Sequence, residues 1–500
     1  MAGIILDYCS VSSGRAAATG VINFSTVPAR YDAVVIGTGF ASSFFLSRYL
    51  DRAGPRVRVL VLERGSLDDH RWQLANRRSS RVESESLFRN ATPSKPWIFT
   101  SGFGGGSNCW WAATPRLLPN DFRLFTRYGV GVDWPVTYDD LEPFYREAER
   151  IMAVSGPDDS SPFPRVRSYP QPPHRFTDPD SLLKQRYPDL FFHLPTARAR
   201  VAAEGRPACC ASGVCTTCPV DAKFTIQNGM RRTYDDPRVT LKLESNAEVV
   251  GVAGSTATSV TYRTQNRDET VAADLVVLGA NALFNAHLLQ RSGLAHPLVG
   301  ARLNEQVAVG VRMKLGGVNN FQGSTSLTGH GYMFYDGDHR RQRAACLVET
   351  SNVIPSILRQ ERGRWRQTME IKLIFEDLPS EANVVQLSAD DPGRPTVIYR
   401  RHSDYAQRGI DAVPAMMTEL GRALPIESYE TVLSGTEGHI QGTTVMGDDP
   451  LRSVVDHRLV HHKVRNLIVA GSGAFPTCPP ANPTLTICAL SLRSAHDLFG

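Results

Sequence analysis

A short glycine-rich motif near the start of the chain has the composition of a phosphate-binding turn. In Gly37-x-Gly39-x-x-Ser42, the first glycine permits a tight turn and the second lets the backbone approach a pyrophosphate. The pyrophosphate then sits at the positive end of the helix that follows. Ser42 replaces a third glycine and is small enough for a helix to pack closely on a strand. The spacing therefore predicts a dinucleotide site.

The residues around this motif support that interpretation. The motif follows a run of β-formers at 31–36, opens an amphipathic stretch to residue 50, and leads to a second apolar run at 56–62. Glu63 ends the second run, where a carboxylate can accept both hydroxyls of a ribose. This β-α-β order favours a dinucleotide site over a structural turn. It does not choose between FAD and NAD, because both contain the same adenosine diphosphate half.

Four of the nine cysteines crowd into ten residues, at Cys209, Cys210, Cys215 and Cys218. Their spacing is poor for a disulfide scaffold, and the odd total favours a reducing compartment. Four thiolates this close can reach one iron–sulfur cluster or one zinc ion, and a bound metal would keep them deprotonated. Buried free thiols are the alternative, and the sequence leaves cluster and free thiols equally open.

Charge and length exclude several classes of partner. The formal net charge of +5 is small for 500 residues, and no block of Lys or Arg forms a stripe that would follow phosphates. Nucleic acid is therefore not expected as a partner. The first thirty residues lack a basic n-region, and the apolar run at 3–6 is too short for a signal sequence or a spanning helix. We expect no membrane insertion and a cytoplasmic location, with export alongside a partner subunit as the alternative.

The elements that must position these motifs divide the chain into three parts. Residues 31–300 form the nucleotide-binding domain, with irregular insertions at 71–135 and 156–230. Residues 301–430 form a substrate-binding domain of alternating strands, and residues 431–500 return to the first domain. A continuous apolar run at 274–279 should rejoin the first sheet, because strands covered on both faces have this pattern.

Several individual elements are also predicted. Antiparallel strands are expected at 239–252 and 256–262, substrate-domain strands at 309–315, 370–375 and 383–387, one amphipathic helix at 405–424, a buried strand at 466–470 and a closing helix at 484–498.

Four further blocks resemble the glucose-methanol-choline (GMC) oxidoreductase family, particularly its pyranose oxidase and bacterial sugar dehydrogenase branches. The blocks are Gly104–Trp111 with Pro115-Arg116, Asp133-Trp134-Pro135 with the following helix, Leu278–Asn281 with Ser292-Gly293, and His439-x-x-Gly442-Thr443 with Asn482–Thr486. The resemblance implies a mixed α/β fold, with a Rossmann-like FAD-binding domain and a separate antiparallel-sheet substrate domain. It also implies FAD as the cofactor and a small-molecule alcohol as the substrate.

The resemblance extends the set of cofactor-binding residues beyond Gly37, Gly39, Ser42 and Glu63. The added residues are Gly105, Gly106, Ser107, Asn108, Cys109, Trp110, Ala280, Gly471, Asn482, Pro483 and Thr484. Cys109 stands where pyranose oxidases carry a histidine bonded covalently to the flavin, so a histidyl bond is impossible here. Non-covalent FAD is the expectation, and a cysteinyl thioether to the flavin stays open.

His439 and Asn482 match the pair that faces the reactive edge of the flavin in this family. A neutral imidazole can take the hydroxyl proton while the amide holds the same oxygen, and hydride leaves for flavin N5. We expect oxidation of a CH–OH group on a sugar, glycoside or aminoglycoside-like molecule. Non-redox flavoproteins of the same family are the alternative.

The cysteine segment resembles the cluster-binding segment of bacterial FAD-dependent glucose dehydrogenases. Cys209, Cys210 and Cys215 keep the ligand spacing of that segment, whereas Cys218 lies one residue nearer. A cluster would pass electrons to an acceptor protein. Without one, oxygen or a quinone would accept them.

Overall fold

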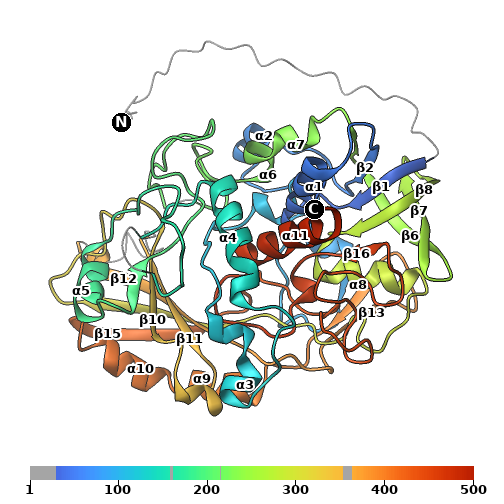
Figure 1. Cartoon of the computed structure of the whole chain (residues 1–500). Helices are drawn as coiled ribbons and strands as arrows, with labels where there is room; N and C mark the ends of the chain where they lie inside the picture. The colour runs from blue at the N-terminus through green and yellow to red at the C-terminus, as the bar shows by residue number, and fades with distance from the viewer. Residues whose placement is uncertain (1–29, 158–160, 214, 353–362) are drawn as a thin grey trace, which may run out of the picture.

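Two large sheets organise the chain in the computed structural model (Figure 1). One has seven strands and lies in the half built mainly from the N-terminal residues. The other has six strands and lies in the opposite half. The residues described are 30–157, 161–213, 215–352 and 363–500. The expectation about a signal sequence concerns residues outside this part.

The seven-stranded sheet contains the predicted β-α-β unit. Its order is β5-β2-β1-β8-β7-β6, and β16 also pairs with β8. The pairs β5–β2, β2–β1, β1–β8 and β8–β16 are parallel, and β6, β7 and β8 form an antiparallel extension. Its strands are β1 (Arg30–Ile36), β2 (Val59–Leu62), β5 (Val239–Lys242), β6 (Ser245–Ala253), β7 (Thr256–Thr264), β8 (Arg267–Leu278) and β16 (Leu467–Val469). The fully buried sequence of β2, Val-Leu-Val-Leu, is typical of a strand covered on both faces.

Three strand predictions for this sheet are confirmed and one is wrong. The antiparallel strand expected at 256–262 is β7. The apolar run at 274–279 ends β8 and pairs with β1, and the strand expected at 466–470 is β16. The single strand expected at 239–252 is instead two strands, β5 and β6. The chain turns between them at Glu244, which has a φ of 50°, so β5 joins the parallel sheet while β6 starts the antiparallel extension.

The six-stranded sheet is antiparallel throughout, in the order β15-β9-β12-β11-β10-β4. Its strands are β4 (Phe191–His193), β9 (Val307–Leu315), β10 (Leu327–Phe334), β11 (Cys346–Ser351), β12 (Thr368–Phe375) and β15 (Ile426–Leu433). Met313, Met369 and Leu373 pack into a core with α9 and α10 on one face. The domain boundaries at 300 and 430 stay a prediction. The six-stranded sheet itself extends beyond them, because β4 lies within the expected insertion at 156–230 and β15 crosses residue 430.

The single helix expected at 405–424 is wrong, because two helices occupy this segment. The structure has α9 (Asp404–Asp411) and α10 (Val413–Leu420), which meet at Ala412. Pro414 lies at the start of α10, and a proline there cannot donate the backbone hydrogen bond that would continue α9. The two short helices still cover the sheet with the predicted apolar residues, among them Met416 and Leu420.

The strand expected at 383–387 exists but belongs elsewhere. It is β13 (Val384–Leu387), which pairs with β14 (Pro395–Ile398), and β14 pairs with β3 (Arg89–Asn90). This small sheet is separate from the six-stranded one.

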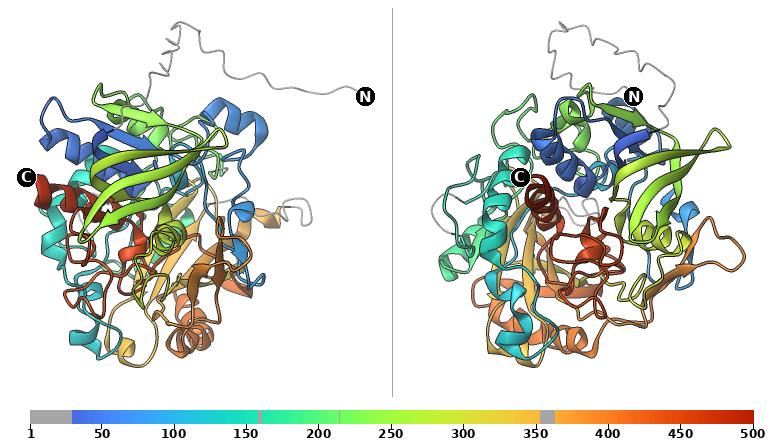
Figure 2. Two further views of the ribbon diagram at one scale, coloured as in Figure 1. Left: turned by 90° about the vertical axis from the view of Figure 1, so that its right-hand side faces the viewer. Right: turned by 45° about the vertical axis from the view of Figure 1, so that its right-hand side comes forward.

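Helices join the two halves. The main ones are α1 (Phe40–Arg52), α4 (Tyr138–Met152), α5 (Asp178–Arg186), α8 (Asn281–Arg291) and α11 (Thr484–Phe499), with shorter helices α2 (His70–Asn76), α3 (Leu124–Tyr128), α6 (Ile226–Gly229) and α7 (Arg231–Tyr234). The closing helix packs between α1 and α4 (Figure 1). The strands β6–β8 and the helices α9 and α10 lie at opposite ends of the molecule (Figure 2). None of the helices in the described ranges has the length and apolarity that a membrane span requires.

Candidate active site

A cavity of about 1050 Å³ lies between the two large sheets. One wall contains residues that follow the carboxyl ends of three parallel strands, namely Gly37 after β1, Glu63 after β2 and Ala280 after β8. The opposite wall contains residues of β9, β12 and β15. Ligands of open α/β sheets bind outside the carboxyl ends of the strands. The cavity therefore lies where the sequence predicts a dinucleotide.

The glycine turn is shaped by close backbone contacts. Gly37 has a φ of 93°, and a Cβ there would lie 2.6 Å from the carbonyl oxygen of Gly279. No side chain caps the start of α1, so its first N–H groups are free to meet a phosphate. Ser42 lies behind the turn, where its Oγ donates to Ile36 O at 3.3 Å. A small residue is needed at this position, because helix and strand approach closely there.

Glu63 organises the loops around the cavity. Oε2 accepts hydrogen bonds from Thr38 N and Oγ1, at 3.1 and 2.7 Å, and Oε1 accepts from Gly65 N and Gly102 N, at 2.9 and 3.1 Å. Thr38 Oγ1 in turn accepts from Gly104 N at 3.0 Å. This carboxylate thus connects the glycine turn to the second glycine loop. Its contact with ribose stays a prediction.

In the second glycine loop, residues on both sides of a buried pair line the cavity. Gly105 and Cys109 line it, whereas Ser107 and Asn108 point into the protein. Ser107 Oγ accepts from Ile226 N at 3.0 Å, and Asn108 Nδ2 donates to Phe103 O at 3.0 Å. The buried pair fixes the loop, and the exposed residues face the ligand space.

Most of the predicted cofactor residues line this cavity. Those that do are Gly37, Gly39, Glu63, Gly105, Gly106, Cys109, Trp110, Ala280, Asn482, Pro483 and Thr484. Those that lie outside its wall are Ser42, Ser107, Asn108 and Gly471. The second set is close enough to shape the wall through hydrogen bonds or tight packing, as Ser42 and Ser107 do.

His439 lines the same cavity, and one of its ring nitrogens is engaged. Nδ1 lies 3.1 Å from Gln306 Oε1, and the backbone N–H of His439 donates to Glu305 Oε1 at 2.9 Å. Burial lowers the pKa of the imidazole, so the ring is neutral at pH 7. No sequence pattern points to Gln306, which reaches His439 only through the fold.

Asn482 presents an unpaired atom to the cavity. The residue is 8% exposed, and Oδ1 makes no hydrogen bond within the part of the chain that the structure describes. A buried amide oxygen without a partner is rare in a folded protein and indicates a position for a ligand. The structure therefore brings both members of the predicted catalytic pair to one cavity.

Charged side chains line the opposite wall of the cavity, and no sequence motif indicates them. Arg312 on β9 lies directly across from Glu370 on β12 and Glu430 on β15, at 2.8 and 3.1 Å. Lys372 pairs with Glu437 at 2.7 Å. Their alternation with apolar residues was visible in the sequence, but the strand register that pairs them was not. This wall offers many donors and acceptors to a polar substrate.

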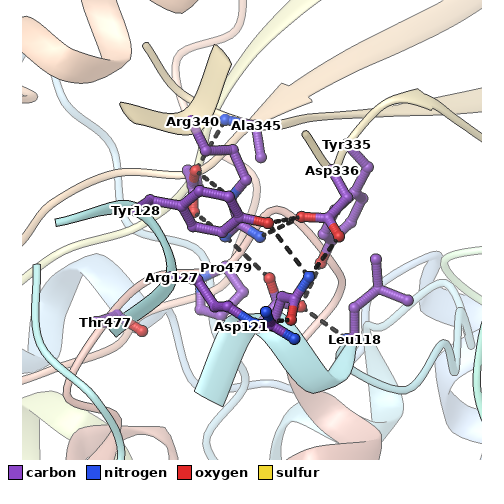
Figure 3. Close-up of polar contacts among 12 residues, drawn as sticks. Leu118, Asp121, Arg127, Tyr128, Tyr335, Asp336, Arg340, Ala345, Thr477 and Pro479 are labelled. Atoms are coloured by element: carbon purple, nitrogen blue, oxygen red, sulfur yellow. Dashed lines mark hydrogen bonds and ion pairs between the residues drawn. The ribbon is translucent and has the colours of Figure 1, made fainter. Parts of the chain in front are cut away.

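A buried ionic network is centred on Arg340 (Figure 3). Arg340 is fully buried and donates to Asp121 at 3.0 Å and to Glu376 at 2.7 Å. Asp121 also accepts from Tyr335 Oη at 2.8 Å and from Leu118 N at 2.7 Å. The network joins the loop before α3 to the end of the six-stranded sheet.

The cysteine segment does not form a closed metal site as it stands. Cys215 and Cys218 are buried, Cys209 is partly buried and Cys210 is exposed. No three potential ligands converge among the residues described. All eight cysteines described are free thiols. The thiols as arranged therefore do not fit an iron–sulfur cluster.

Comparison with known proteins shows a family match in the C-terminal part of the chain and relatives over most of its length. Residues 379–491, which include His439 and Asn482, match the family model described as GMC oxidoreductase. Over this segment the chain is similar to the family. It is 28% identical to the fructose dehydrogenase large subunit of Gluconobacter japonicus, over 94% of this chain and 97% of that protein. It is 29% identical to the paromamine 6'-oxidase of Streptomyces fradiae, over 94% of this chain and 91% of that protein.

Solved structures confirm the expected fold of the chain. Pyridoxine 4-oxidase from Mesorbium loti superposes with a TM-score of 0.65 at 16% identity, over 94% of this chain and 99% of that one. The mixed α/β fold with a Rossmann-like domain and a substrate domain is thus confirmed. The uncapped start of α1 and the glycine cradle fit the pyrophosphate of FAD, the cofactor that the resemblance implies. The family match and the two relatives support an oxidoreductase activity for the chain.

Proposed function

We propose that this chain is a GMC oxidoreductase that oxidises a CH–OH carbon of a sugar, glycoside or aminoglycoside-like alcohol, with His439 as the base. Bound FAD supplies the hydride acceptor, flavin N5. His439 Nε2 takes the hydroxyl proton, and the carbon that carries the hydroxyl becomes a carbonyl. Asn482 holds the substrate oxygen. The hydrogen bond between His439 Nδ1 and Gln306 carries this proposal, because it leaves Nε2 as the basic nitrogen.

Two observations support a polyhydroxylated substrate. The wall opposite the nucleotide side contains Arg312, Glu370, Glu430 and Lys372, which can bind several hydroxyls or an amine. Two of the relatives that match 94% of the chain are named for fructose and for paromamine. A simple alkyl alcohol has one hydroxyl and would leave most of the hydrogen-bonding capacity of these ion pairs unused.

Anaerobic mixing of the FAD-loaded protein with candidate substrates tests this function. The panel contains fructose, glucose, paromamine and short alkyl alcohols, and the signal is loss of the oxidised flavin absorbance. We expect bleaching by at least one sugar or amino sugar and none by the alkyl alcohols. If dithionite bleaches the flavin and every alcohol fails, the chain is a non-redox flavoprotein.

For the electron acceptor we propose a redox partner protein, with dioxygen as the alternative. The cysteine segment and the likeness to a protein named as a large subunit support a partner. Because the thiols do not converge on one point, we derive no electron-transfer step through a cluster. Oxygen consumption during turnover distinguishes the two acceptors. The free thiols support a reducing compartment, the cytoplasm, unless a partner subunit carries the chain across a membrane.

A further inference from the structure

Carboxylates outnumber cations on the wall of the cavity opposite the nucleotide side. The charged residues that line this wall comprise four carboxylates and two cations. They are Glu349, Glu370, Glu430, Glu437, Arg312 and Lys372. The lining side chains therefore have a formal excess of negative charge. A wall with such an excess favours a ligand that carries positive charge.

Lys372 shows how strongly part of this wall favours a cation. Its ammonium pairs with Glu437 Oε2 at 2.7 Å, and Glu349 lies directly across from it on β11. Burial by itself would lower the pKa of Lys372, but the nearby carboxylates, led by Glu437, raise it above its ordinary value. One lysine therefore does not neutralise the carboxylates around it.

Glu437 has an oxygen atom that the described part of the chain does not satisfy. Its side chain is 4% exposed, and Oε1 makes no hydrogen bond to any residue described. Glu349 differs, because its Oε2 lies 3.3 Å from His330 Nε2. A buried carboxylate oxygen without a donor is unfavourable and indicates a position for a ligand. An ammonium group has three N–H donors and a positive charge, so it supplies both the donor that Oε1 lacks and the charge that the wall lacks.

Glu437 also lies close to the proposed base. It precedes His439 by two residues, lines the same cavity, and its charge acts on the imidazole. One small molecule can therefore contact both side chains. The hydroxyl that is oxidised and the group that Glu437 binds would belong to the same ligand.

We propose that Glu437 binds an ammonium group of the substrate, so that this cavity selects amino sugars over neutral sugars. This inference rests on the proposed function, because it concerns the substrate of the same site. Oε1 receives the ammonium while Oε2 keeps its pair with Lys372, so binding breaks no ion pair.

Binding without turnover tests the selectivity. Holoenzyme whose flavin is already reduced by dithionite cannot accept a hydride, so anaerobic calorimetric titration measures affinity alone. Glucosamine is compared with glucose, which has a hydroxyl in place of the amine, and paromamine is compared with its N-acetylated form, which carries no positive charge. We expect at least one of the two amines to bind the wild type about tenfold or more tightly than its neutral counterpart. This comparison requires no variant.

Glu437→Gln assigns the preference to this carboxylate. The amide keeps the size of the side chain but not its charge, so the preference for the amine should fall about tenfold or more while the affinity for the neutral counterpart changes little. Glu269→Gln is the matched control, because Glu269 also pairs with a lysine, Lys242 at 2.6 Å, but lies outside the cavity. This control should keep the preference of the wild type.

The outcomes separate this inference from the proposed function. A wild type that prefers neither amine overturns the inference, and so does a preference that Glu437→Gln keeps. Flavin bleaching is recorded separately on the oxidised holoenzyme. If neutral sugars bleach the flavin and neither amine is preferred, the oxidation stands and the selectivity fails. If an amine is preferred and no alcohol bleaches the flavin, the proposed oxidation fails while the ammonium site stands.

Discussion

Gln306 fixes the tautomer of His439. The amide nitrogen of Gln306 donates to Pro479 O and Ala481 O, at 2.8 and 3.0 Å, so its oxygen must face the imidazole. An amide oxygen only accepts hydrogen bonds, and His439 Nδ1 at 3.1 Å is therefore the protonated ring nitrogen. In a neutral imidazole the other nitrogen, Nε2, then carries the lone pair. The same glutamine binds the backbone that leads to Asn482, so it links the two members of the catalytic pair.

Replacing Gln306 by leucine should slow flavin reduction without releasing FAD. The imidazole loses the acceptor that holds its tautomer and orientation, and we expect a fall of roughly 10- to 100-fold, a part of what a general base contributes. Anaerobic stopped-flow absorbance measures the rate constant. Gln290→Leu is the matched control, because Gln290 also donates to two carbonyls, of Val299 and Val385, but lies outside the cavity. Equal rates in both variants would exclude a role for Gln306.

The pH dependence of flavin reduction should show that His439 acts as a base. Burial lowers its pKa below the ordinary 6.5, and the carboxylates Glu437, Glu305 and Glu349 only partly oppose this shift. A base works when unprotonated, so the rate should stay level at pH 7 and fall as the pH drops through the lowered pKa. Gln306→Glu places a carboxylate against Nδ1, which favours the imidazolium and raises that pKa. The acid limb of the variant should therefore lie at higher pH than that of the wild type. Identical profiles would contradict the assignment.

Removing either member of the catalytic pair should affect chemistry more than binding of the cofactor. For His439→Ala we expect flavin reduction to fall about 100- to 10,000-fold, the usual contribution of a general base. For Asn482→Ala we expect a smaller fall, because a positioning hydrogen bond is lost and the base remains. His461→Asn is the control, since its Nδ1 accepts two backbone N–H groups away from the cavity and an amide oxygen can replace it. A near-normal rate for His439→Ala would remove His439 from the mechanism.

The elements that could be predicted from the sequence are those set by the hydrophobic pattern of nearby residues. The strand before Gly37 and the strand before Glu63 are short apolar runs bounded by turn residues, so their type and order follow from nearby residues alone. The helix at 405–424 was predicted as one piece because the apolar spacing continues across Pro414. The break depends on a single missing backbone donor.

The substrate wall depends on contacts that sequence patterns do not contain. Arg312 meets Glu370 and Glu430 only because three strands, distant in sequence, align in one register. Gln306 meets His439 through a separation of 133 residues. The hydrophobic pattern of one strand indicates on which side of the sheet a residue lies. It does not indicate which residue of a neighbouring strand lies opposite. The resemblance to the family supplied His439 and Asn482, whereas their supporting residue required the structure.

Glu63→Gln should weaken FAD retention. The wild-type carboxylate accepts four hydrogen bonds from the loops at 38, 65 and 102. An amide leaves two of these donors facing an NH₂ group, and each unsatisfied donor costs about 1 to 3 kcal/mol. We expect the affinity for FAD to fall at least about tenfold. The ratio of FAD to protein after gel filtration measures it, with the exposed Glu85→Gln as control. Full occupancy in Glu63→Gln would show that the loops keep their shape without this carboxylate.

Arg340→Met should destabilise the protein in a way that acid partly reverses. The guanidinium is the buried partner of both Asp121 and Glu376, and its loss leaves uncompensated carboxylates, at a cost of about 3 to 5 kcal/mol. Arg341→Met is the control, because Arg341 is exposed and pairs with Asp338, at 3.5 Å.

The acid effect follows from burial of Asp121. Burial raises its pKa from 3.8 to about 6 even with Arg340 present, and removing Arg340 raises it further. The folded state then binds protons at a higher pH than the unfolded state, so lowering the pH from above 6 toward 4 stabilises the fold. The stability difference between wild type and Arg340→Met, measured by urea unfolding, should shrink as the pH falls from the higher pKa of the variant toward 6, and then level off because Asp121 of the wild type also takes up the proton. A difference that stays constant with pH would show that the carboxylates find other partners when Arg340 is removed.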